Sequence, residues 1–561
     1  MNCCKSIPEF LMYYFDKQGR YSFKNIDFEN QRLWVDLTEY CLNNIDKNAD
    51  LYALLSDITR YGRACEKNRE QAFKYLIAGI NEGSVFCLWS LGVFYSCGIH
   101  VEQSDSISFA YYLEAAKKGC IPCMYNIALR YRDGRGITKD DKKEVYWYYQ
   151  AAVQGHIISQ FNLGVSYEYG QGIQKDLEKA VYWYKKAAHQ GHELAQYNLG
   201  VCYNEGRGIP QDKERALSWL TEAAEQDNSN AAFYLGNYFA EGEVPNYEKS
   251  AYWFDKAAKQ GNPKAQFILA NYYENGTGVL QSVGKAAYWW AKSAELGEAE
   301  SQYKIGLCYA NGVGVIQDDD KALYWLKKAA NQNLSKAQFD LGSLYFNGRC
   351  VKQNQTEAIS WWTKVAERGD GKVQYLLGDC YRKGVGVGQS DEMAAYWYKR
   401  SAKQGNEKAQ VVIAKCYIEG KGIEQDVEQA VYWYKRAASS EYSDGQYNLG
   451  HCYDKGIGLP QDSEKALYWY EKAARQGHND AQYNLGVYYY NGQNVPKDPE
   501  QAAFWWEKSA NQNNAESQFN LANCYEKGLG IEQSIEKAKY WYKRAAAQGH
   551  SIAKNVLNLL I

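Results

Sequence analysis

Apolar residues recur along this chain at helical spacing, and the whole pattern returns after 36 residues. Residues 176–208 read DLEKAVYWYKKAAHQGHELAQYNLGVCYNEGRG, in which Ala180, Trp183 and Ala187 fall at i, i+3 and i+7. A second apolar stripe consists of Ala195, Leu199 and Tyr203. Each stripe occupies one face of a helix. The segment therefore predicts two amphipathic helices joined by a Gln-Gly turn and followed by a Gly-x-Gly turn.

One aromatic residue anchors each copy of this pattern. The anchors are Tyr75, Tyr111, Trp147, Trp183, Trp219, Trp253, Trp289, Trp325, Trp361, Trp397, Trp433, Trp469, Trp505 and Trp541. Every interval is 36 residues except the 34 between Trp219 and Trp253, where two residues are missing from the turn GEVPN. A fixed period of this length is typical of a solenoid, and turns tolerate such deletions.

Two further positions mark the ends of the predicted helices. A residue suited to capping a helix N-terminus stands seven positions before every anchor, as Asp176 does before Trp183. Its side-chain oxygen accepts hydrogen bonds from first-turn amides, so the later helix of each copy is predicted to begin there. The position of Gly206 is glycine in every copy, from Gly62 to Gly528. That constancy indicates a left-handed or closely packed backbone where the earlier helix ends.

These positions together read A-x-x-x-L-G-x-x-Y-x-x-G-x-G-[IV]-x-x-D-x-x-K-A-x-x-W-x-x-K-A-A-x-Q-G, which resembles the Sel-one-like repeat (SLR) family, relatives of the tetratricopeptide repeats. The resemblance covers about nine-tenths of the chain. It implies an all-α fold, a right-handed α-solenoid of stacked antiparallel helix pairs with a 36-residue repeat, whose first helices line a concave face. Family members are mostly adaptors and scaffolds.

The repeats define the predicted domain organisation, one elongated domain. Residues 47–549 hold fourteen copies, the first of them degenerate. Residues 1–46 do not fit the repeat and are expected to form a small helical cap, with a recruitment motif as the alternative. Residues 550–561 begin one more first helix and stop; this closing half-repeat is either a cap or a contact for another chain.

Composition narrows the classes of function. The formal net charge is -2 without a run of Lys and Arg, which argues against a nucleic-acid partner. We find no apolar run of signal-peptide or membrane-spanning length, so the expected location is the cytoplasm, or the host cytosol if the source is an intracellular pathogen or virus. Six of the fifteen cysteines share one repeat position, too far from their own copies for disulfides, which fits free thiols in a reducing compartment.

Candidate chemistry is sparse. Cys120 and Cys123 form a CxxC, but the sheet that accompanies redox motifs of this type is not predicted. The glycine patterns recur as turns after helices rather than as phosphate loops after strands. His156, His192 and His478 share one turn position with no acidic or serine partner at constant spacing. The sequence therefore predicts no catalytic residue, cofactor or metal site.

Two positions of the first helix carry different residue types from copy to copy, whereas the framework positions stay constant. One aligns with Val201 and the other with Asn204; we call them the Val201 set and the Asn204 set. If first helices line a concave face, these sets form a groove that is apolar near the N-terminal end and polar toward the C-terminal repeats. Exposed positions free to drift are the alternative explanation. The predicted partner-binding residues are Asn237, Asn271, Asp379, Arg382, Lys415, His451 and Asn523.

The predicted function is an intracellular, non-enzymatic scaffold or adaptor that binds partner proteins or peptide segments along this face. One alternative is a hydrolase, because some cysteine-rich relatives in the family act on β-lactam-type ligands. Another is a quality-control or signalling regulator subunit. The partner and the oligomeric state are not specified by the sequence.

Overall fold

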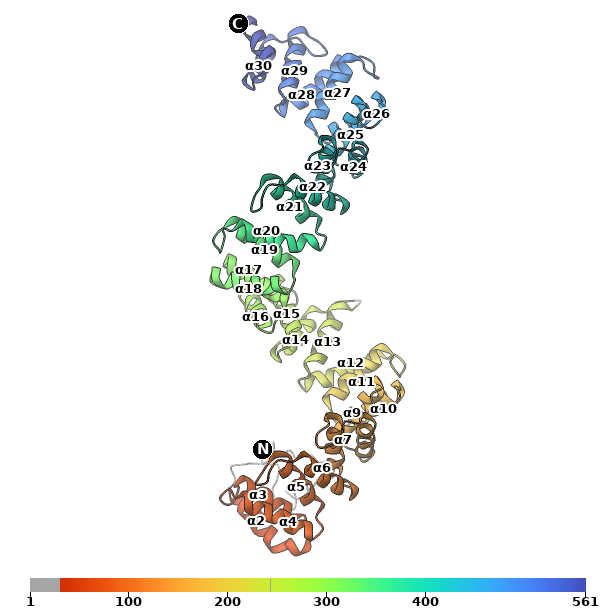
Figure 1. Ribbon diagram of the computed structural model, residues 1–561, viewed down its shortest axis with the longest axis vertical. Helices are drawn as coiled ribbons and strands as arrows, with labels where there is room; N and C mark the ends of the chain where they lie inside the picture. The colour runs from red at the N-terminus through yellow and green to blue at the C-terminus, as the bar shows by residue number, and fades with distance from the viewer. Residues whose placement is uncertain (1–30, 243, 561) are drawn as a thin grey trace. The chain divides into compact units, whose positions relative to one another are not determined.

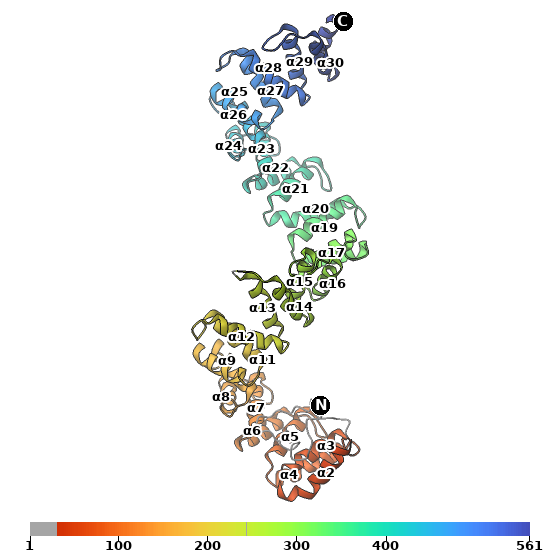
Figure 2. The same ribbon diagram turned by 180° about the vertical axis from the view of Figure 1, so that it is seen from behind.

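The computed structural model describes residues 31–242 and 244–560, with side chains from 34 to 557 apart from residue 243. Within these residues all regular structure is helical, and Figures 1 and 2 show it from opposite sides. The chain opens with α2 (Gln31–Asn44) and the short 3-10 helix η2 (Ile45–Lys47). The predicted all-α class is confirmed.

The first helices of the copies share one length over most of the chain. They are α3 (Leu51–Tyr61), α5 (Val85–Cys97), α7 (Ile121–Asp133), α9 (Ile157–Tyr169), α11 (Glu193–Glu205), α13 (Ser229–Glu241), α15 (Pro263–Asn275), α17 (Ala299–Asn311), α19 (Ser335–Asn347), α21 (Gly371–Lys383), α23 (Glu407–Glu419), α25 (Ser443–Lys455), α27 (Asn479–Asn491), α29 (Ala515–Lys527) and α31 (Ser551–Leu560).

The second helices alternate with them. They are α4 (Arg69–Asn81), α6 (Asp105–Lys117), α8 (Asp141–Val153), α10 (Leu177–Ala188), α12 (Lys213–Glu225), α14 (Tyr247–Lys259), α16 (Val283–Glu295), α18 (Asp319–Asn331), α20 (Gln355–Glu367), α22 (Asp391–Lys403), α24 (Val427–Ser439), α26 (Ser463–Arg475), α28 (Pro499–Asn511) and α30 (Ile535–Ala547). Within each unit, consecutive helices pack against one another.

The chain divides into two compact units, Met1–Ser293 and Ala294–Ile561. In the first unit, α2 buries Trp34 and Leu37 in one core with Leu54 of α3. Most of the predicted cap, residues 1–30, lies outside the described residues. In the second unit, the predicted closing half-repeat is the helix α31, whose Leu557 packs on the last core cluster; its final side chains are also outside the described part.

The predicted caps begin the second helices in all fourteen copies. Asp176 accepts a hydrogen bond from the Lys179 amide at 3.0 Å, and the corresponding bonds in the other copies fall between 2.9 and 3.3 Å. Each cap satisfies an amide that the helix leaves without an internal partner, which stabilises it by about 1 kcal/mol. The start of every second helix is therefore fixed locally.

The predicted apolar stripes form the core between adjacent helices. Ala180, Ala187, Ala195 and Leu199 are completely or almost completely buried, and the Trp183 anchor is 8% exposed. The residue after each anchor is also buried, and it is usually aromatic, as at Tyr184. We call these residues the inner aromatic set; its members are Leu76, Tyr112, Tyr148, Tyr184, Leu220, Phe254, Trp290, Leu326, Trp362, Tyr398, Tyr434, Tyr470, Trp506 and Tyr542.

The turn after the first helix is left-handed in most copies but not in all. Gly206 has a φ of +69° and a ψ of 30°, which only glycine adopts at little cost. In the shortened copy, Gly242 has instead a φ of −63° and a ψ of 163°, an extended conformation. In this copy the glycine therefore departs from the expected left-handed or closely packed backbone.

Buried glutamines connect successive copies, a feature that the sequence analysis did not predict. Gln196 on α11 donates to the Ala188 carbonyl at 3.4 Å and accepts from the Gln226 amide at 2.6 Å. The same exchange between glutamines 30 residues apart joins five further pairs. We call this the glutamine ladder. Because buried amides must be paired, the ladder joins six pairs of neighbouring copies by specific hydrogen bonds as well as by apolar contact.

Three rungs of the ladder, at Gln266, Gln374 and Gln410, lack a donor to the glutamine oxygen in the described part of the chain. Gln410 on α23 donates to the Ala402 carbonyl at 3.3 Å, but its buried oxygen has no hydrogen-bond partner in the described part of the chain. The residue 30 positions later is Ser440. Its backbone angles, −83° and 14°, resemble those of Gln226, −85° and 22°, so a glutamine fits there.

We expect Ser440→Gln to stabilise the protein by about 1 kcal/mol, because it supplies a hydrogen bond to a buried acceptor. Chemical denaturation of the substituted and unsubstituted proteins measures the difference. The control is Ser439→Gln at the neighbouring exposed residue. Ser439 does not lie 30 positions after a ladder glutamine, so the new amide is not placed to bond to one. Equal changes in both variants would contradict the assignment of the missing rung.

Candidate functional site

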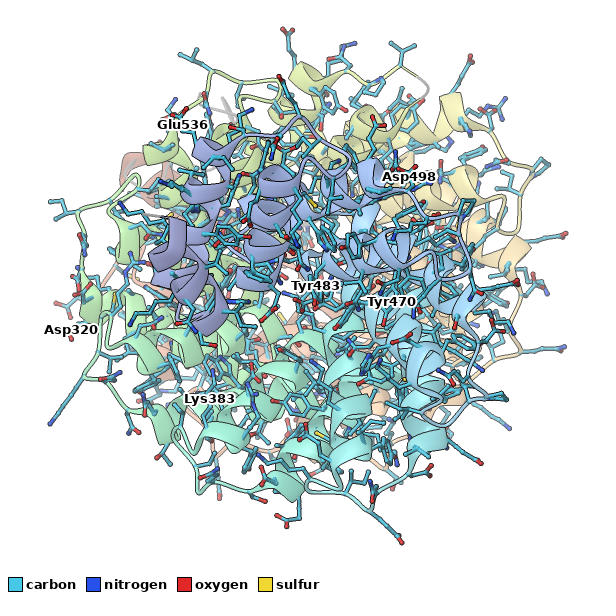
Figure 3. The ribbon with its side chains drawn as sticks, turned by 90° about the horizontal axis from the view of Figure 1, so that it is seen from above. Asp320, Lys383, Tyr470, Tyr483, Asp498 and Glu536 are labelled. Carbon is cyan, nitrogen blue, oxygen red and sulfur yellow. The ribbon has the colours of Figure 1, made fainter. Side chains whose placement is uncertain are left out.

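The seven predicted binding residues all lie on first helices but belong to different units. Two are in the first unit, on α13 and α15; five are in the second unit, on α21, α23, α25 and α29. In Figure 3, Tyr483 of the first helix α27 lies near the middle of the end-on view, whereas Asp320 of the second helix α18 lies at the outer edge. Tyr470 of the second helix α26 also lies toward the middle of this view.

Asp379 has an internal partner as well as an exposed one. Its Oδ1 accepts a hydrogen bond from the Tyr398 hydroxyl at 2.6 Å and from Arg382 Nη2 at 3.1 Å. Tyr398 belongs to the inner aromatic set and is completely buried. Burial and, as the second cause, the Asp379 carboxylate raise the pKa of Tyr398. The hydroxyl therefore stays protonated and donates the hydrogen bond. Asp379 therefore serves the core of its own copy in addition to any role at the surface.

The same pairing recurs in three other copies, whereas Trp362 and Trp506 of the inner aromatic set donate to backbone carbonyls instead. Asn271 accepts from the Trp290 indole N–H at 3.1 Å. Glu168 and Glu526, both of the Asn204 set, accept from the hydroxyls of their own inner tyrosines at 2.6 and 2.7 Å. Part of the scatter between copies thus follows from the need to satisfy a buried donor. This pairing crosses two helices, and the spacing of the sequence alone did not reveal it.

The remaining predicted residues differ in how far they reach the surface. Arg382 and Lys415 are exposed, whereas Asn237, His451 and Asn523 are half-buried. The His451 ring stacks on Tyr447 with centroids 6.3 Å apart, and burial lowers the pKa of His451. Arg382 and Lys415 are thus the predicted side chains most available to a partner in the second unit.

A hollow of about 250 Å³ opens on the first helices α17 and α19 of the second unit. Its wall includes Leu307 and Ser343, both of the Val201 set, together with Asp340 and Arg349. The inner residue at its base is Leu326, where most other copies have a tyrosine, tryptophan or phenylalanine. The shorter side chain fills less of the space, so the hollow arises where the inner aromatic ring is missing.

The regular aromatic position aligned with Tyr197 serves packing between copies. Phe161 lies 6.0 Å from the inner Tyr184 ring and stacks on His192 of the next copy at 4.7 Å. Tyr447 stacks in the same way on His478 at 4.4 Å. These ring contacts show that the aromatic residue at this position packs successive copies against one another.

The histidines of the inter-helix turn are helix caps. Nδ1 of His192 accepts from the Ala195 amide at 3.2 Å, and His156, His478 and His550 accept equivalent bonds at 3.1 to 3.3 Å. An accepting Nδ1 requires the neutral ring with its proton on Nε2. The sequence analysis treated these histidines only as turn residues, although the asparagines at the same position in other copies were a signal for capping.

Acid should weaken the protein through His156, which is 6% exposed. Burial lowers the pKa of His156 to about 4, below the ordinary value of 6.5. As the pH falls below 6.5, His156 binds a proton in the unfolded chain but stays neutral in the folded chain until the pH approaches 4. We therefore expect a loss on the order of 3 kcal/mol between pH 6.5 and 4, measured by denaturation at several pH values.

The matched control for this pH dependence is His156→Asn, because asparagine already caps the corresponding helix at Asn262 and Asn406. This variant keeps the cap and removes the titrating ring. Its stability should fall less steeply with acid than that of the unsubstituted protein. Parallel curves for the two proteins would show that His156 does not carry the effect.

The cysteines show burial rather than activation. All thirteen described cysteines are free. Cys120 and Cys123 lie with their sulfurs 2.7 Å apart, both buried, and burial raises the pKa of Cys123, opposite to the shift of a reactive thiol. Among the described residues, no cluster of His, Cys, Asp or Glu has metal-binding geometry. No described helix has the length and apolar character needed to span a membrane.

Comparison with known proteins agrees with this arrangement of helices. The Sel1 repeat matches fourteen segments: 50–84, 85–120, 121–156, 157–192, 194–228, 229–262, 263–298, 299–334, 335–370, 371–406, 408–442, 443–478, 479–514 and 515–550. The chain belongs to the Sel1 repeat family. These repeats and their tetratricopeptide-like relatives generally mediate interactions between proteins.

Two solved structures illustrate the likeness of this Sel1 repeat chain to its relatives. One is c5321, a protective antigen present in uropathogenic Escherichia coli strains and displaying an SLR fold: 31% identity, TM-score 0.57, covering 81% of this chain and 90% of that one. The other is a Sel1 repeat protein from Oxalobacter formigenes: 30% identity, TM-score 0.35, covering 62% of this chain and 90% of that one. No curated protein matches the chain.

Proposed function

We propose that this Sel1 repeat protein is a non-enzymatic scaffold that binds partner proteins on the first-helix face of its repeats. The observation that carries the proposal is the contrast between framework and face. The inner aromatic set is buried in every copy, whereas the varying positions of the Val201 and Asn204 sets range from buried, as at Val201, to exposed, as at Arg382 and Lys415. Surfaces of stacked repeats are suited to extended partners.

In the second unit, two features of the face suit a protein partner. Arg382 and Lys415 offer exposed positive charge on α21 and α23. The hollow bounded by Leu307 and Leu344 offers a place for an apolar side chain, with Asp340 and Arg349 at its polar side. Binding of this kind combines a buried anchor with charged contacts that set orientation. Free, buried thiols support the further proposal that the protein works in a reducing compartment such as the cytosol.

The test is affinity capture from the source cells with a variant that changes only the exposed charges. We expect Arg382→Ala with Lys415→Ala to lower capture of the partner roughly 3- to 10-fold, corresponding to about 1 kcal/mol. Asp379 is left intact, because its removal would leave the buried Tyr398 hydroxyl without an acceptor.

The matched control is Lys403→Ala with Lys435→Ala, which removes the same charge from exposed positions of second helices. A partner captured equally by both variants would place the contact away from the first-helix face and contradict the proposal. Turnover of a chromogenic β-lactam by the purified protein would contradict the non-enzymatic role. Circular dichroism verifies that all proteins are folded.

A further inference from the structure

In other copies, the turn between the first and second helix fills a position beside the preceding copy. The shortened copy leaves this position empty. The turn from first to second helix normally runs over seven residues, as in Gly206–Asp212, but here it runs over five, 242–246. The turn N–H of Asn246 therefore bonds to the Phe239 carbonyl, seven residues back, whereas that of Asp212 bonds to Tyr203, nine residues back. The shortened turn follows a more direct path.

Elsewhere the second glycine of the turn rests on the preceding copy. In eight copies a Cβ on this glycine would lie no more than 2.8 Å from a backbone carbonyl oxygen. That oxygen always belongs to the first residue of the preceding second helix, as with Gly208 on Leu177 and Gly278 on Tyr247. In these eight copies the turn backbone covers the first turn of the neighbouring second helix so closely that an added Cβ would overlap it. Three other copies place His100, Cys350 and Asn494 at this position, each with a positive φ.

The equivalent first residue for the shortened copy is Lys213 of α12. A cleft of about 890 Å³ lies beside it, between the start of α12 and the end of α13. The cleft is lined by Asn204, Gln211, Lys213, Tyr234, Asn237, Tyr238, Phe239, Glu241, Gly242, Val244 and Asn246. All of these residues belong to the first unit. The cleft therefore occupies the place where the other copies pack their own turn.

The lining suits a polypeptide backbone better than a charged ligand. Asn204, Gln211, Asn237 and Asn246 carry side-chain amides, which can both donate and accept as a peptide group does. Tyr238 is 37% exposed and Val244 is 88% exposed, so ring and apolar surface face solvent at the rim. Among the described lining residues, Lys213 and Glu241 carry opposite charges.

We propose that this cleft binds a glycine-containing turn or extended segment of a partner polypeptide, in the place that the other copies fill with their own turn. The inference rests on the proposed scaffold function and assigns it a specific subsite. The chain itself supplies the argument for the occupant, because eight of its copies show a glycine-bearing backbone seated at the equivalent position. It also gives a new role to Asn237, one of the residues singled out from the sequence.

The test uses the protein's own turn as the probe. A fluorescent peptide with the sequence of residues 274–282, ENGTGVLQS, is titrated with the purified full-length protein and followed by anisotropy. We expect saturable binding with a Kd of roughly 0.1 to 1 mM, as befits a short peptide. The same peptide carrying Gly278→Val should bind at least tenfold more weakly, because the added side chain meets the α12 backbone.

Two protein variants locate the site. Replacing residues 242–246 by the sequence of residues 276–282 restores the 36-residue copy and should abolish peptide binding, because the chain then fills its own cleft. Tyr238→Ala removes rim surface without changing the turn and should weaken binding at least threefold. The matched control is Tyr252→Ala, an equally aromatic change at a residue of the same copy that is 61% exposed and outside the cleft lining.

Several results would overturn the inference: no binding by the unsubstituted protein, equal binding of the two peptides, or full binding by a folded turn-restored variant. If the turn-restored variant does not fold, Tyr238→Ala against Tyr252→Ala decides. The outcome is separable from that of the capture experiment, whose substitutions lie in the second unit. Loss of capture with Arg382→Ala and Lys415→Ala, without peptide binding here, would remove this subsite but leave the scaffold function.

Discussion

Trp433→Ala is expected to lower the free energy of unfolding of its region by roughly 3 to 5 kcal/mol. Trp433 is 3% exposed and belongs to a core cluster that joins Ile413 of α23 and Leu449 of α25. Removing its ring leaves a cavity between two copies, and a packed solenoid has no central core from which the loss can be compensated. The effect should concentrate in α23 to α25.

Hydrogen exchange is the measurement that separates this local effect from a general one. Amides of α24 and α25 should exchange much faster in Trp433→Ala, while those of α29 keep their protection. The control is Tyr432→Ala at the adjacent position, whose ring is 47% exposed and packs edge-on against Trp433 at 5.0 Å. It should cost about 1 kcal/mol or less. Equal costs for the two variants would contradict the anchor role of the tryptophan.

Much of the fold could be predicted because its causes are local. The cap, the apolar stripe and the turn glycine each act within a few residues, so their spacing carries the information. Asp176 caps its helix and Ala180 and Trp183 are buried, as their spacing predicted. Fourteen copies make such a signal strong, because each copy repeats the same local argument.

Interactions between helices were harder to foresee. Ten copies place a glutamine beside the small residue of the first helix, as Gln196 follows Ala195. The constancy of a polar residue in a buried stripe was a usable signal for the glutamine ladder, but its partner lies 30 residues away. Asp379 was assigned to a partner surface because it varies between copies, whereas its contact with Tyr398 depends on packing across two helices.

The accessibility of the predicted binding residues could not be derived from the sequence. Sequence comparison between copies found first-helix positions that vary, and these do reach the surface to different extents. Which of them remain available depends on whether the inner residue presents a donor, as Tyr398 does, or is a short chain such as Leu326 that leaves a hollow. The two-residue deletion was visible in the sequence, yet the cleft beside Lys213 follows only from where other copies place their turns.

The contact between turns and preceding helices leads to the second large prediction, for Gly422→Ala. Gly422 has a φ of +69°, and an added Cβ would overlap the Asp391 carbonyl oxygen at the start of α22. Both groups are backbone, so neither can move aside without displacing a helix. We expect a cost of roughly 2 to 5 kcal/mol, the sum of left-handed strain and overpacking, measured by chemical denaturation.

Gly420→Ala separates the two contributions to this cost. Gly420 has nearly the same φ, +65°, but a Cβ there would meet only the Gln425 Cβ at 3.4 Å, an ordinary contact. This variant should therefore pay the left-handed strain alone, about 1 to 2 kcal/mol. If Gly422→Ala costs no more, the close packing of turn on helix contributes nothing to stability. An excess cost of Gly422→Ala would show that this turn lies too close to the start of α22 to accept a methyl group, the tight packing that the shortened copy lacks.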